Sequence, residues 1–266
     1  MPFIQANNVV LNCCLSGNPD GVPLVFVNSL GTDLRIWDEV VPRFEQNYRV
    51  VRYDKRGHGL SDCPSAPYSI RDHADDLVAL LDVLGVNSTN IESTAVFIGI
   101  SVGGMIAQEV AAAWPERVNK LVLCDTAAKI GTAEMWNKRI DTLRAEGMEA
   151  LADPILSRWF APGFQSQQPV AYQGYRHMLT RTPVTGYTGT CEAIRDADLT
   201  EATRTIQAPT LVLCGAEDGA TTTEMVRGLA ALLPNARYQE IAKAGHLPCV
   251  EQPEVTAVHI QTFLQA

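Results

Sequence analysis

The chain has 266 residues, of which 46% are hydrophobic and 19% are charged, and this composition is typical of a folded globular protein and not of a disordered chain. Lys and Arg number 21 and Asp and Glu number 30, so the formal net charge of −9 argues against nucleic acid and anionic membranes as partners. No apolar run reaches the length of a transmembrane helix, and the first residues lack the pattern of a secretory signal.

Short apolar runs alternate with helical patterns along most of the chain. This alternation predicts an α/β fold with a mostly parallel central sheet that is flanked by helices. Strands are predicted over residues 8–15, 24–28, 48–53, 94–98, 118–124, 210–214 and 236–241, and helices over 35–46, 70–84, 102–114, 221–233 and 252–264.

Residues 128–204 break this alternation. The segment is rich in Trp, Arg, Gln and Pro and contains few strand-like runs. We expect it to form a helical cap insertion in a core that comprises residues 1–127 and 205–266.

The strongest chemical signal is the segment GISVGG at positions 99–104, between a predicted strand and a predicted helix. Gly-x-Ser-x-Gly at a strand-to-helix turn is typical of a nucleophile elbow, in which glycines allow a tight turn and the serine hydroxyl projects beyond the sheet. We therefore expect Ser101 to be a catalytic nucleophile.

A serine nucleophile needs a base, and the base needs an acid that orients it. His246 follows the predicted strand 236–241, and Asp218 follows the predicted strand 210–214. Both lie at the carboxyl end of a strand, as Ser101 does, and α/β sheets place their sites at that edge. We expect Ser101, Asp218 and His246 to form a catalytic triad.

Other residues are weaker candidates for the acid and the base of the triad. Asp125, at the end of the predicted strand 118–124, is the first alternative to Asp218 as the acid, and Glu217 is a weaker one. The remaining histidines, at positions 58, 73, 177 and 259, are interpreted as structural or exposed.

Two backbone amides are expected to stabilise a negatively charged reaction intermediate. The amide of Val102, at the start of the predicted helix, should point to where an oxyanion forms. A second donor is expected from the backbone of Leu30, in the segment NSLG after the strand 24–28. Ser29 in the same segment is a candidate polar contact for a substrate.

The seven cysteines are an odd number, and some lie in apolar runs, such as Cys124 in LVLCD and Cys214 in LVLCG. We expect reduced, mostly buried thiols in a cytoplasmic protein. No CxxC pair or His/Cys cluster has the spacing of metal ligands, so neither a metal nor another cofactor is predicted.

With these residues in place, the chain resembles the α/β-hydrolase superfamily over nearly its whole length. The resemblance rests on the loop DKRGHGLS at 54–61, the elbow at 99–104, the segment GAED at 215–218 and the pair Gly245-His246. One departure is that many members have His-Gly before the oxyanion loop, where this chain has Asn28-Ser29.

Three further groups of residues narrow the resemblance. They are NSLGTD at 28–33 leading to Trp37-Asp38, RWF at 158–160 with Pro162 and Phe164, and GY at 186–187 leading to AIRDADL at 193–199. In these segments the chain resembles the 3-oxoadipate enol-lactonases. This resemblance implies a cofactor-free, cytoplasmic serine hydrolase that opens an enol-lactone to 3-oxoadipate in the β-ketoadipate pathway of aromatic-compound catabolism.

The implied partner is a small anionic lactone, and a local cation must offset the repulsion between its carboxylate and the negatively charged protein. Arg139 is favoured, because Trp136 three residues earlier would share its helix face. Arg158 with its neighbour Trp159 is the rival pair. The arginines of the predicted cap are at positions 139, 144, 158, 176, 181, 195 and 204.

Two other classes of function remain open from the sequence. A carboxylesterase or a carbon–carbon bond hydrolase would use the same triad on another substrate. A non-catalytic sensor of the same fold would bind a lactone without turning it over. The sequence leaves the oligomeric state open as well.

Overall fold

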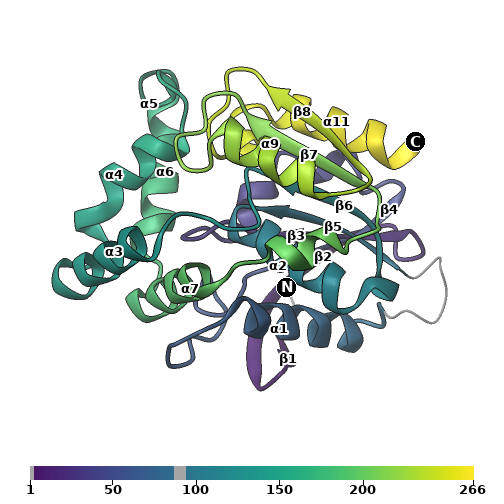
Figure 1. Ribbon diagram of the computed structural model, residues 1–266, viewed down its shortest axis with the longest axis horizontal. Coiled ribbons are helices and arrows are strands. Elements are labelled where there is room, and N and C mark those ends of the chain that lie inside the picture. Colours follow the sequence, from purple (N-terminus) through teal and green to yellow (C-terminus); the bar gives the residue numbers. More distant parts are fainter. Residues whose placement is uncertain (1–2, 87–93) are drawn as a thin grey trace.

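The computed structural model describes residues 3–86 and 94–266. Within these residues the chain forms one eight-stranded sheet with helices on both sides (Figure 1). The strands are β1 (Phe3–Ala6), β2 (Val9–Gly17), β3 (Val22–Val27), β4 (Tyr48–Tyr53), β5 (Ala95–Ile100), β6 (Val118–Cys124), β7 (Thr210–Gly215) and β8 (Ala236–Ile241).

The strand order in the sheet is β1-β2-β4-β3-β5-β6-β7-β8. β2 is antiparallel to β1 and to β4, and all other neighbouring strands are parallel. The mostly parallel sheet that the sequence predicts is therefore confirmed. Parallel pairing brings the carboxyl ends of β5, β7 and β8 to the same edge of the sheet.

The helices flank the sheet or lie between β6 and β7 in the chain. α2 contacts α1 and α8, and α8 also contacts α9, whereas α10 contacts α11 and the 3₁₀ helix η1. The α-helices are α1 (Ile70–Val83), α2 (Val102–Ala113), α3 (Ala133–Glu146), α4 (Glu149–Trp159), α5 (Phe164–Gln167), α6 (Pro169–Thr180), α7 (Val184–Asp196), α8 (Thr200–Arg204), α9 (Thr223–Leu232), α10 (Pro248–Glu251) and α11 (Pro253–Gln265), and the 3₁₀ helices are η1 (Leu34–Trp37), η2 (Val41–Arg43) and η4 (Pro115–Arg117).

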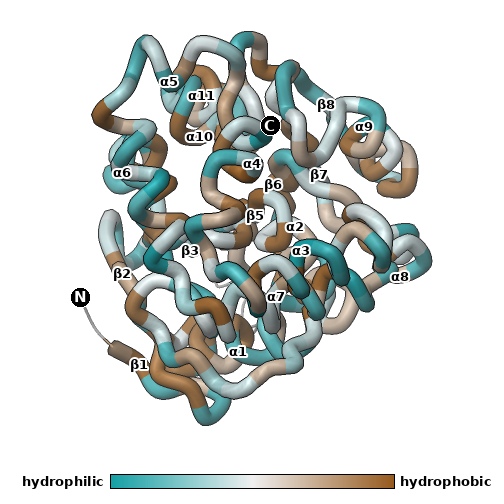
Figure 2. Tube along the Cα trace, turned by 90° about the vertical axis from the view of Figure 1, so that its left-hand side faces the viewer, coloured by the Kyte–Doolittle hydropathy of each residue, from teal (hydrophilic) through white to brown (hydrophobic). Residues whose placement is uncertain are grey.

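The inner strands are apolar along their whole length because layers of helices cover both faces. Every residue of β5 and β7 is buried, and so are residues 23–27 of β3. Figure 2 shows hydrophobic colours in the inner strands β5 and β6 and more hydrophilic colours along α3 and α8 at the outside. Burial of this apolar surface is the main favourable contribution to folding.

Helices α3 to α7 lie together beside one end of the sheet, at the left of Figure 1. α3 contacts both α4 and α7, and α6 contacts α4. α3 begins where the side chain of Thr132 accepts a hydrogen bond from the amide of Met135, and it ends before Gly147, whose φ is 77°. These caps fix the length of the helix that carries Arg139.

The predicted helix over residues 35–46 is wrong. The chain forms two 3₁₀ helices there, η1 and η2, with Pro42 in the second. Pro42 lacks an amide hydrogen, so it cannot donate the hydrogen bond that a continuous α-helix over 35–46 would need there, and the chain forms two short 3₁₀ helices on either side of residues 38–40. The strand β1 was not predicted either, because its four residues, FIQA, are too few for a periodic signal.

Five of the seven cysteines are buried, as expected, and all seven are free. Within the described residues, no helix combines the length and the apolar character that a membrane span requires. The buried cysteines are Cys13, Cys124, Cys191, Cys214 and Cys249.

Candidate active site

Ser101 lies in a sharp turn between β5 and α2, with φ 56° and ψ −123°. A positive φ is unusual for a residue other than glycine, and the two flanking glycines allow the turn by letting backbones approach closely. A Cβ on Gly99 would lie 2.3 Å from the carbonyl oxygen of Gly103, and one on Gly103 would lie 2.2 Å from the carbonyl oxygen of Val27. The turn therefore holds the Ser101 side chain at the pocket, beyond the strand end.

His246 and Asp218 are both buried, and His246 Nδ1 lies 2.9 Å from Asp218 Oδ2. The hydroxyl of Thr221 donates to the same oxygen at 2.6 Å, and the amides of Ala220 and Thr221 donate to Oδ1 at 2.6 and 3.1 Å. Burial raises the pKa of Asp218, but His246 and these donors outweigh it, so the pKa is lowered overall. The ionised carboxylate keeps the proton of His246 on Nδ1, which leaves Nε2 as the proton acceptor.

Neither rival acid contacts His246 within the described part of the chain. Asp125 Oδ1 accepts a hydrogen bond from the amide of Gly215 at 2.7 Å. Burial and the charge of Asp218 raise the pKa of Asp125 well above its usual value. Glu217 is exposed and lines a different pocket. Asp218 is therefore the carboxylate that can orient the imidazole.

The other histidines lie outside the pocket that Ser101 lines. His58 is buried and accepts a hydrogen bond from the amide of Gly31 at 3.0 Å through Nε2. Burial lowers the pKa of both His58 and His73 well below the usual value. Within residues 3–86 and 94–266, no group of three or more His, Cys, Asp or Glu side chains could hold a metal ion.

The amides of Leu30 and Val102 are free to bind an anion. Neither N–H has a hydrogen-bond acceptor among the residues that the structure describes. Val102 is the first residue of α2, and the first amides of a helix have no partner within it. Ser29 and Leu30 line the same pocket as Ser101, and the buried hydroxyl of Ser29 has no hydrogen-bond partner among the described residues.

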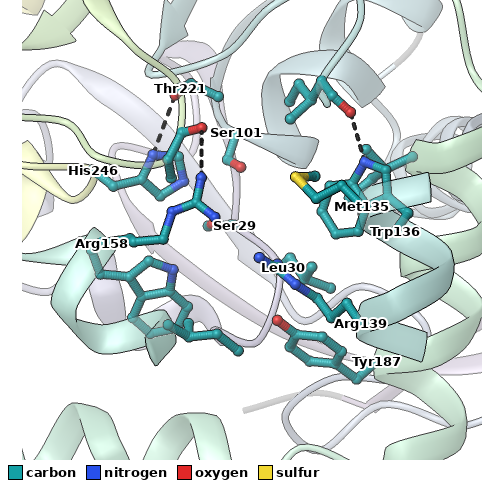
Figure 3. Close-up of a pocket in the computed structure, with 15 residues that line it drawn as sticks. Ser29, Leu30, Ser101, Met135, Trp136, Arg139, Arg158, Tyr187, Thr221 and His246 are labelled. Carbon is teal, nitrogen blue, oxygen red and sulfur yellow. Dashed lines mark hydrogen bonds between the residues drawn. The ribbon is translucent and has the colours of Figure 1, made fainter. Parts of the chain in front are cut away.

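Ser101 and His246 lie at a pocket whose wall comes largely from α3, α4 and α7 (Figure 3). The candidate binding residues Ser29, Trp136, Arg139 and Trp159 all lie in it. The apolar lining comes from Leu30, Ile130, Met135, Trp136, Ile155, Trp159, Ile194 and Ala220, and the polar lining from Ser29, Ser101, Arg139, Arg158, Tyr187, Thr221 and His246.

Two of the seven arginines in residues 128–204 line this pocket, Arg139 and Arg158, and no carboxylate pairs with either one in the described chain. Arg181 lines a separate pocket. The other four, Arg144, Arg176, Arg195 and Arg204, each form an ion pair with a carboxylate. Arg139 and Arg158 therefore differ from the other five arginines, because they combine a place in this pocket with a guanidinium that no carboxylate pairs in the described residues.

The two pocket arginines are held in different ways. The guanidinium of Arg139 lies 4.8 Å from the centre of the Trp136 ring, so these two residues share a helix face as the sequence predicts. Arg158 Nε donates to the carbonyl oxygen of Gly219 at 2.8 Å. Burial, and after it the repulsion from the positive charge of Arg139, lower the pKa of Arg158. An anion between them would relieve this repulsion.

The loop that carries His246 is joined to the end of α4. The amide of His246 donates to the carbonyl oxygen of Trp159 at 2.8 Å. The carboxylate of Glu251 accepts from the amide of Ala161 at 2.8 Å and from that of Gly245 at 2.6 Å. The imidazole therefore keeps a fixed position relative to the pocket wall.

Sequence reasoning did not assign a role to Thr221 or Tyr187. Thr221 follows Asp218 by three residues, and a threonine at this distance from a loop aspartate is a usable local signal for a side-chain hydrogen bond. Tyr187 lies next to Arg139 in the pocket (Figure 3). It comes from α7, and no local pattern connects α7 with α3.

The chain is similar to known proteins over nearly its whole length. Residues 22–253 match the model of the family described as the alpha/beta hydrolase fold. The chain is 37% identical to 3-oxoadipate enol-lactonase 2 of Acinetobacter baylyi over 94% of this chain and 91% of that protein, and 34% identical to 3-oxoadipate enol-lactonase 1 of the same organism over 92% and 89%. The crystal structure of the enol-lactonase from Burkholderia xenovorans superposes with a TM-score of 0.95 at 36% identity, over 100% of both chains.

Proposed function

Since the chain belongs to the alpha/beta hydrolase fold family and is an ester or lactone hydrolase, we propose that it opens 3-oxoadipate enol-lactone to 3-oxoadipate in the β-ketoadipate pathway. The observation that carries the proposal is the pocket in which Ser101 and His246 share one cavity with two arginines that no carboxylate neutralises in the described chain. The names of the relatives point to the same substrate.

In the proposed first step, His246 Nε2 takes the proton of the Ser101 hydroxyl while its oxygen attacks the lactone carbonyl. The amides of Leu30 and Val102 donate to the oxyanion that forms. Collapse of this intermediate breaks the ring C–O bond and leaves an acyl-enzyme. The leaving group is an enolate, which departs more readily than an alkoxide. It takes the proton back from Nε2 of His246 to become the enol, which tautomerises to the ketone, and this leaves His246 neutral for the second step.

The second step releases the product. His246 takes a proton from a water molecule, which attacks the acyl-enzyme carbonyl and forms a second oxyanion at the same two amides. Collapse returns the proton to Ser101 and frees the second carboxylate of 3-oxoadipate. Asp218 stabilises the charged imidazole in both steps through the 2.9 Å hydrogen bond to Nδ1.

The free carboxylate of the lactone is assigned to Arg139, with Arg158 as the second cation of the pocket. A guanidinium can donate two parallel hydrogen bonds to a carboxylate, and the apolar walls strengthen that attraction by excluding water. Trp136 and Trp159 would contact the ring of the lactone, and Ser29 would donate its unpartnered hydroxyl. Residues 128–204 act in this proposal as a cap that supplies the cations.

Turnover of a substrate panel tests the proposal. The purified protein is assayed on 3-oxoadipate enol-lactone, an aryl ester and a carbon–carbon ring-fission product, and we expect the highest kcat/KM on the lactone. Preference for either other substrate would favour the carboxylesterase or the carbon–carbon bond hydrolase. Saturable lactone binding without multiple turnover would favour a sensor.

The Ser101→Ala variant tests the nucleophile in the same assay. We expect it to fold and to lose turnover by several orders of magnitude, because the attacking oxygen is gone. Ser166→Ala is the matched control, since Ser166 is exposed on α5, and it should keep wild-type turnover. A folded Ser101→Ala protein with near wild-type activity would refute the triad.

A further inference from the structure

A buried lysine is bonded to the peptide unit that supplies one of the proposed oxyanion donors. Lys55 is 1% exposed, and its Nζ lies 2.5 Å from the carbonyl oxygen of Ser29. That oxygen and the N–H of Leu30 belong to the same peptide unit. Thr32 also donates to this carbonyl, from its hydroxyl at 2.9 Å and from its amide at 3.4 Å.

The second oxyanion peptide unit has the same arrangement. The hydroxyl of Thr126, which is fully buried, donates to the carbonyl oxygen of Ser101 at 2.6 Å. That oxygen and the N–H of Val102 belong to one peptide unit. The amides of Gly104 and Met105 donate to the same carbonyl at 2.9 and 3.1 Å, as the first turn of α2 requires. The threonine hydroxyl is therefore additional to the helical bonds.

We propose that Lys55 and Thr126 are positioning residues that fix and polarise the two peptide units of the oxyanion site, an inference that rests on the function proposed above. Each residue donates to the carbonyl oxygen of a unit whose N–H binds the oxyanion. A hydrogen bond at the oxygen withdraws electron density from the peptide group, and the N–H of that group becomes a stronger donor. Neither side chain touches the substrate.

The burial of Lys55 supports this role. Burying an amine is unfavourable unless its hydrogen bonds are satisfied, and within the described residues Ser29 O is the acceptor that Lys55 bonds. Burial lowers the pKa of Lys55 to about 7, while the nearby carboxylates of Asp54 and Asp33 act in the opposite direction. Both the charged and the neutral amine carry N–H groups, so the bond to Ser29 persists in either state.

The size of the effect follows from the coupling between hydrogen bonds. One oxyanion donor contributes roughly 10²- to 10³-fold to kcat. A neighbouring hydrogen bond strengthens such a bond by about 10–30%. Taken as a share of the logarithm of the 10²- to 10³-fold contribution, this corresponds to a roughly two- to eightfold change in kcat for each positioning residue.

The test compares Thr126→Val, which removes the hydroxyl at nearly constant volume, with Thr126→Ser, which keeps it. Lys55→Met removes the amine and keeps an unbranched side chain. For Thr126→Val and Lys55→Met we expect kcat to fall roughly two- to eightfold with KM unchanged. Thr126→Ser should stay close to wild type. The inhibition constant of a boronic acid, which forms a tetrahedral adduct with a nucleophilic serine, should rise by the factor by which kcat falls, and that of adipate should not change.

Thr210→Val is the matched control for the loss of a buried hydroxyl. Thr210 is fully buried at the start of β7, away from the strand ends that carry the triad, and its hydroxyl donates to the carbonyl oxygen of Ala208 at 2.9 Å. We expect Thr210→Val to lower the Tm without a change in kcat or in boronic acid affinity, because it is remote from the oxyanion site.

The outcomes separate this inference from the proposed function. Wild-type kcat and boronic acid affinity in folded Thr126→Val and Lys55→Met would overturn the inference, and so would equal losses in Thr126→Ser and Thr126→Val. Where Lys55→Met does not fold, the Thr126 pair decides. An active Ser101→Ala protein would overturn the proposed function itself, whereas an inactive one with unaffected Thr126→Val overturns the positioning role alone.

Discussion

Replacing Arg139 by methionine removes one of the two cations in the pocket and keeps a side chain of similar length beside Trp136. A hydrogen bond to a charged group contributes about 1.5–3 kcal/mol, which corresponds to a roughly 10- to 150-fold change in kcat/KM. Arg158 stays in place as a second cation, so we expect kcat/KM on the lactone to fall by an amount near the lower end of this range, about 10- to 30-fold.

The assay measures kcat/KM on 3-oxoadipate enol-lactone and on a neutral aryl ester. The loss should be selective for the lactone, because only the lactone carries a carboxylate. Arg144→Met is the matched control, since Arg144 lies on the same helix and pairs with Glu192 at 2.8 Å, outside the pocket. It should leave kcat/KM on both substrates close to wild type, because neither Arg144 nor Glu192 lines the pocket.

Two results would refute this reasoning. Unchanged kcat/KM on both substrates would remove Arg139 from the binding site. Equal losses on both substrates would mean that the substitution disturbs folding or the shape of the pocket and not the recognition of an anion. In the second case Arg158→Met, assayed in the same way, would show whether the other cation carries the selectivity.

Two further predictions concern titratable groups. Asp218→Asn should lower kcat by roughly 10⁴-fold, because an asparagine no longer holds the proton of His246 on Nδ1. Asp125→Asn should lower kcat far less, because Asp125 bonds the amide of Gly215. A larger fall in kcat for Asp125→Asn than for Asp218→Asn would reverse the assignment of the acid. For Lys55, burial lowers the pKa from 10.5 to about 7, so between these values the folded protein binds fewer protons than the unfolded chain and its stability rises with pH. The Tm of the wild type should therefore rise relative to that of Lys55→Met between pH 7 and 10, and parallel Tm curves across this window would contradict the shifted pKa.

The sheet could be predicted from the sequence because its strands are apolar along their length and alternate with amphipathic helices. The residues 24–27 and 210–214 are buried on both faces, and burial of this kind leaves a continuous apolar run in the sequence. The segment 35–46 was harder to predict. Its apolar residues suit a helix, but Pro42, which lies inside η2, cannot donate a helical hydrogen bond, and the chain forms η1 and η2 in place of one α-helix.

The three residues of the proposed triad could be identified from the sequence for a related reason. Ser101, Asp218 and His246 each follow a predicted strand, and parallel strands bring their carboxyl ends to one edge. Part of the pocket lining could not be predicted in this way. Tyr187 reaches the pocket from α7, and the packing of α7 against α3 depends on contacts between helices that are far apart in the sequence.

The bonds between the His246 loop and the end of α4 bear on how relatives of this enzyme can diverge. They use the backbone atoms of Trp159, Ala161 and Gly245, and only Glu251 contributes a side chain. Side chains along α3, α4 and α7 can therefore be exchanged to suit another substrate without moving the imidazole. Insertions or deletions between Trp159 and Ala161 would displace it. In chimeras that take these helices from a relative, the length of this junction must be conserved, and Gly245 must stay a glycine, because a Cβ there would lie 2.6 Å from the carbonyl oxygen of Trp159.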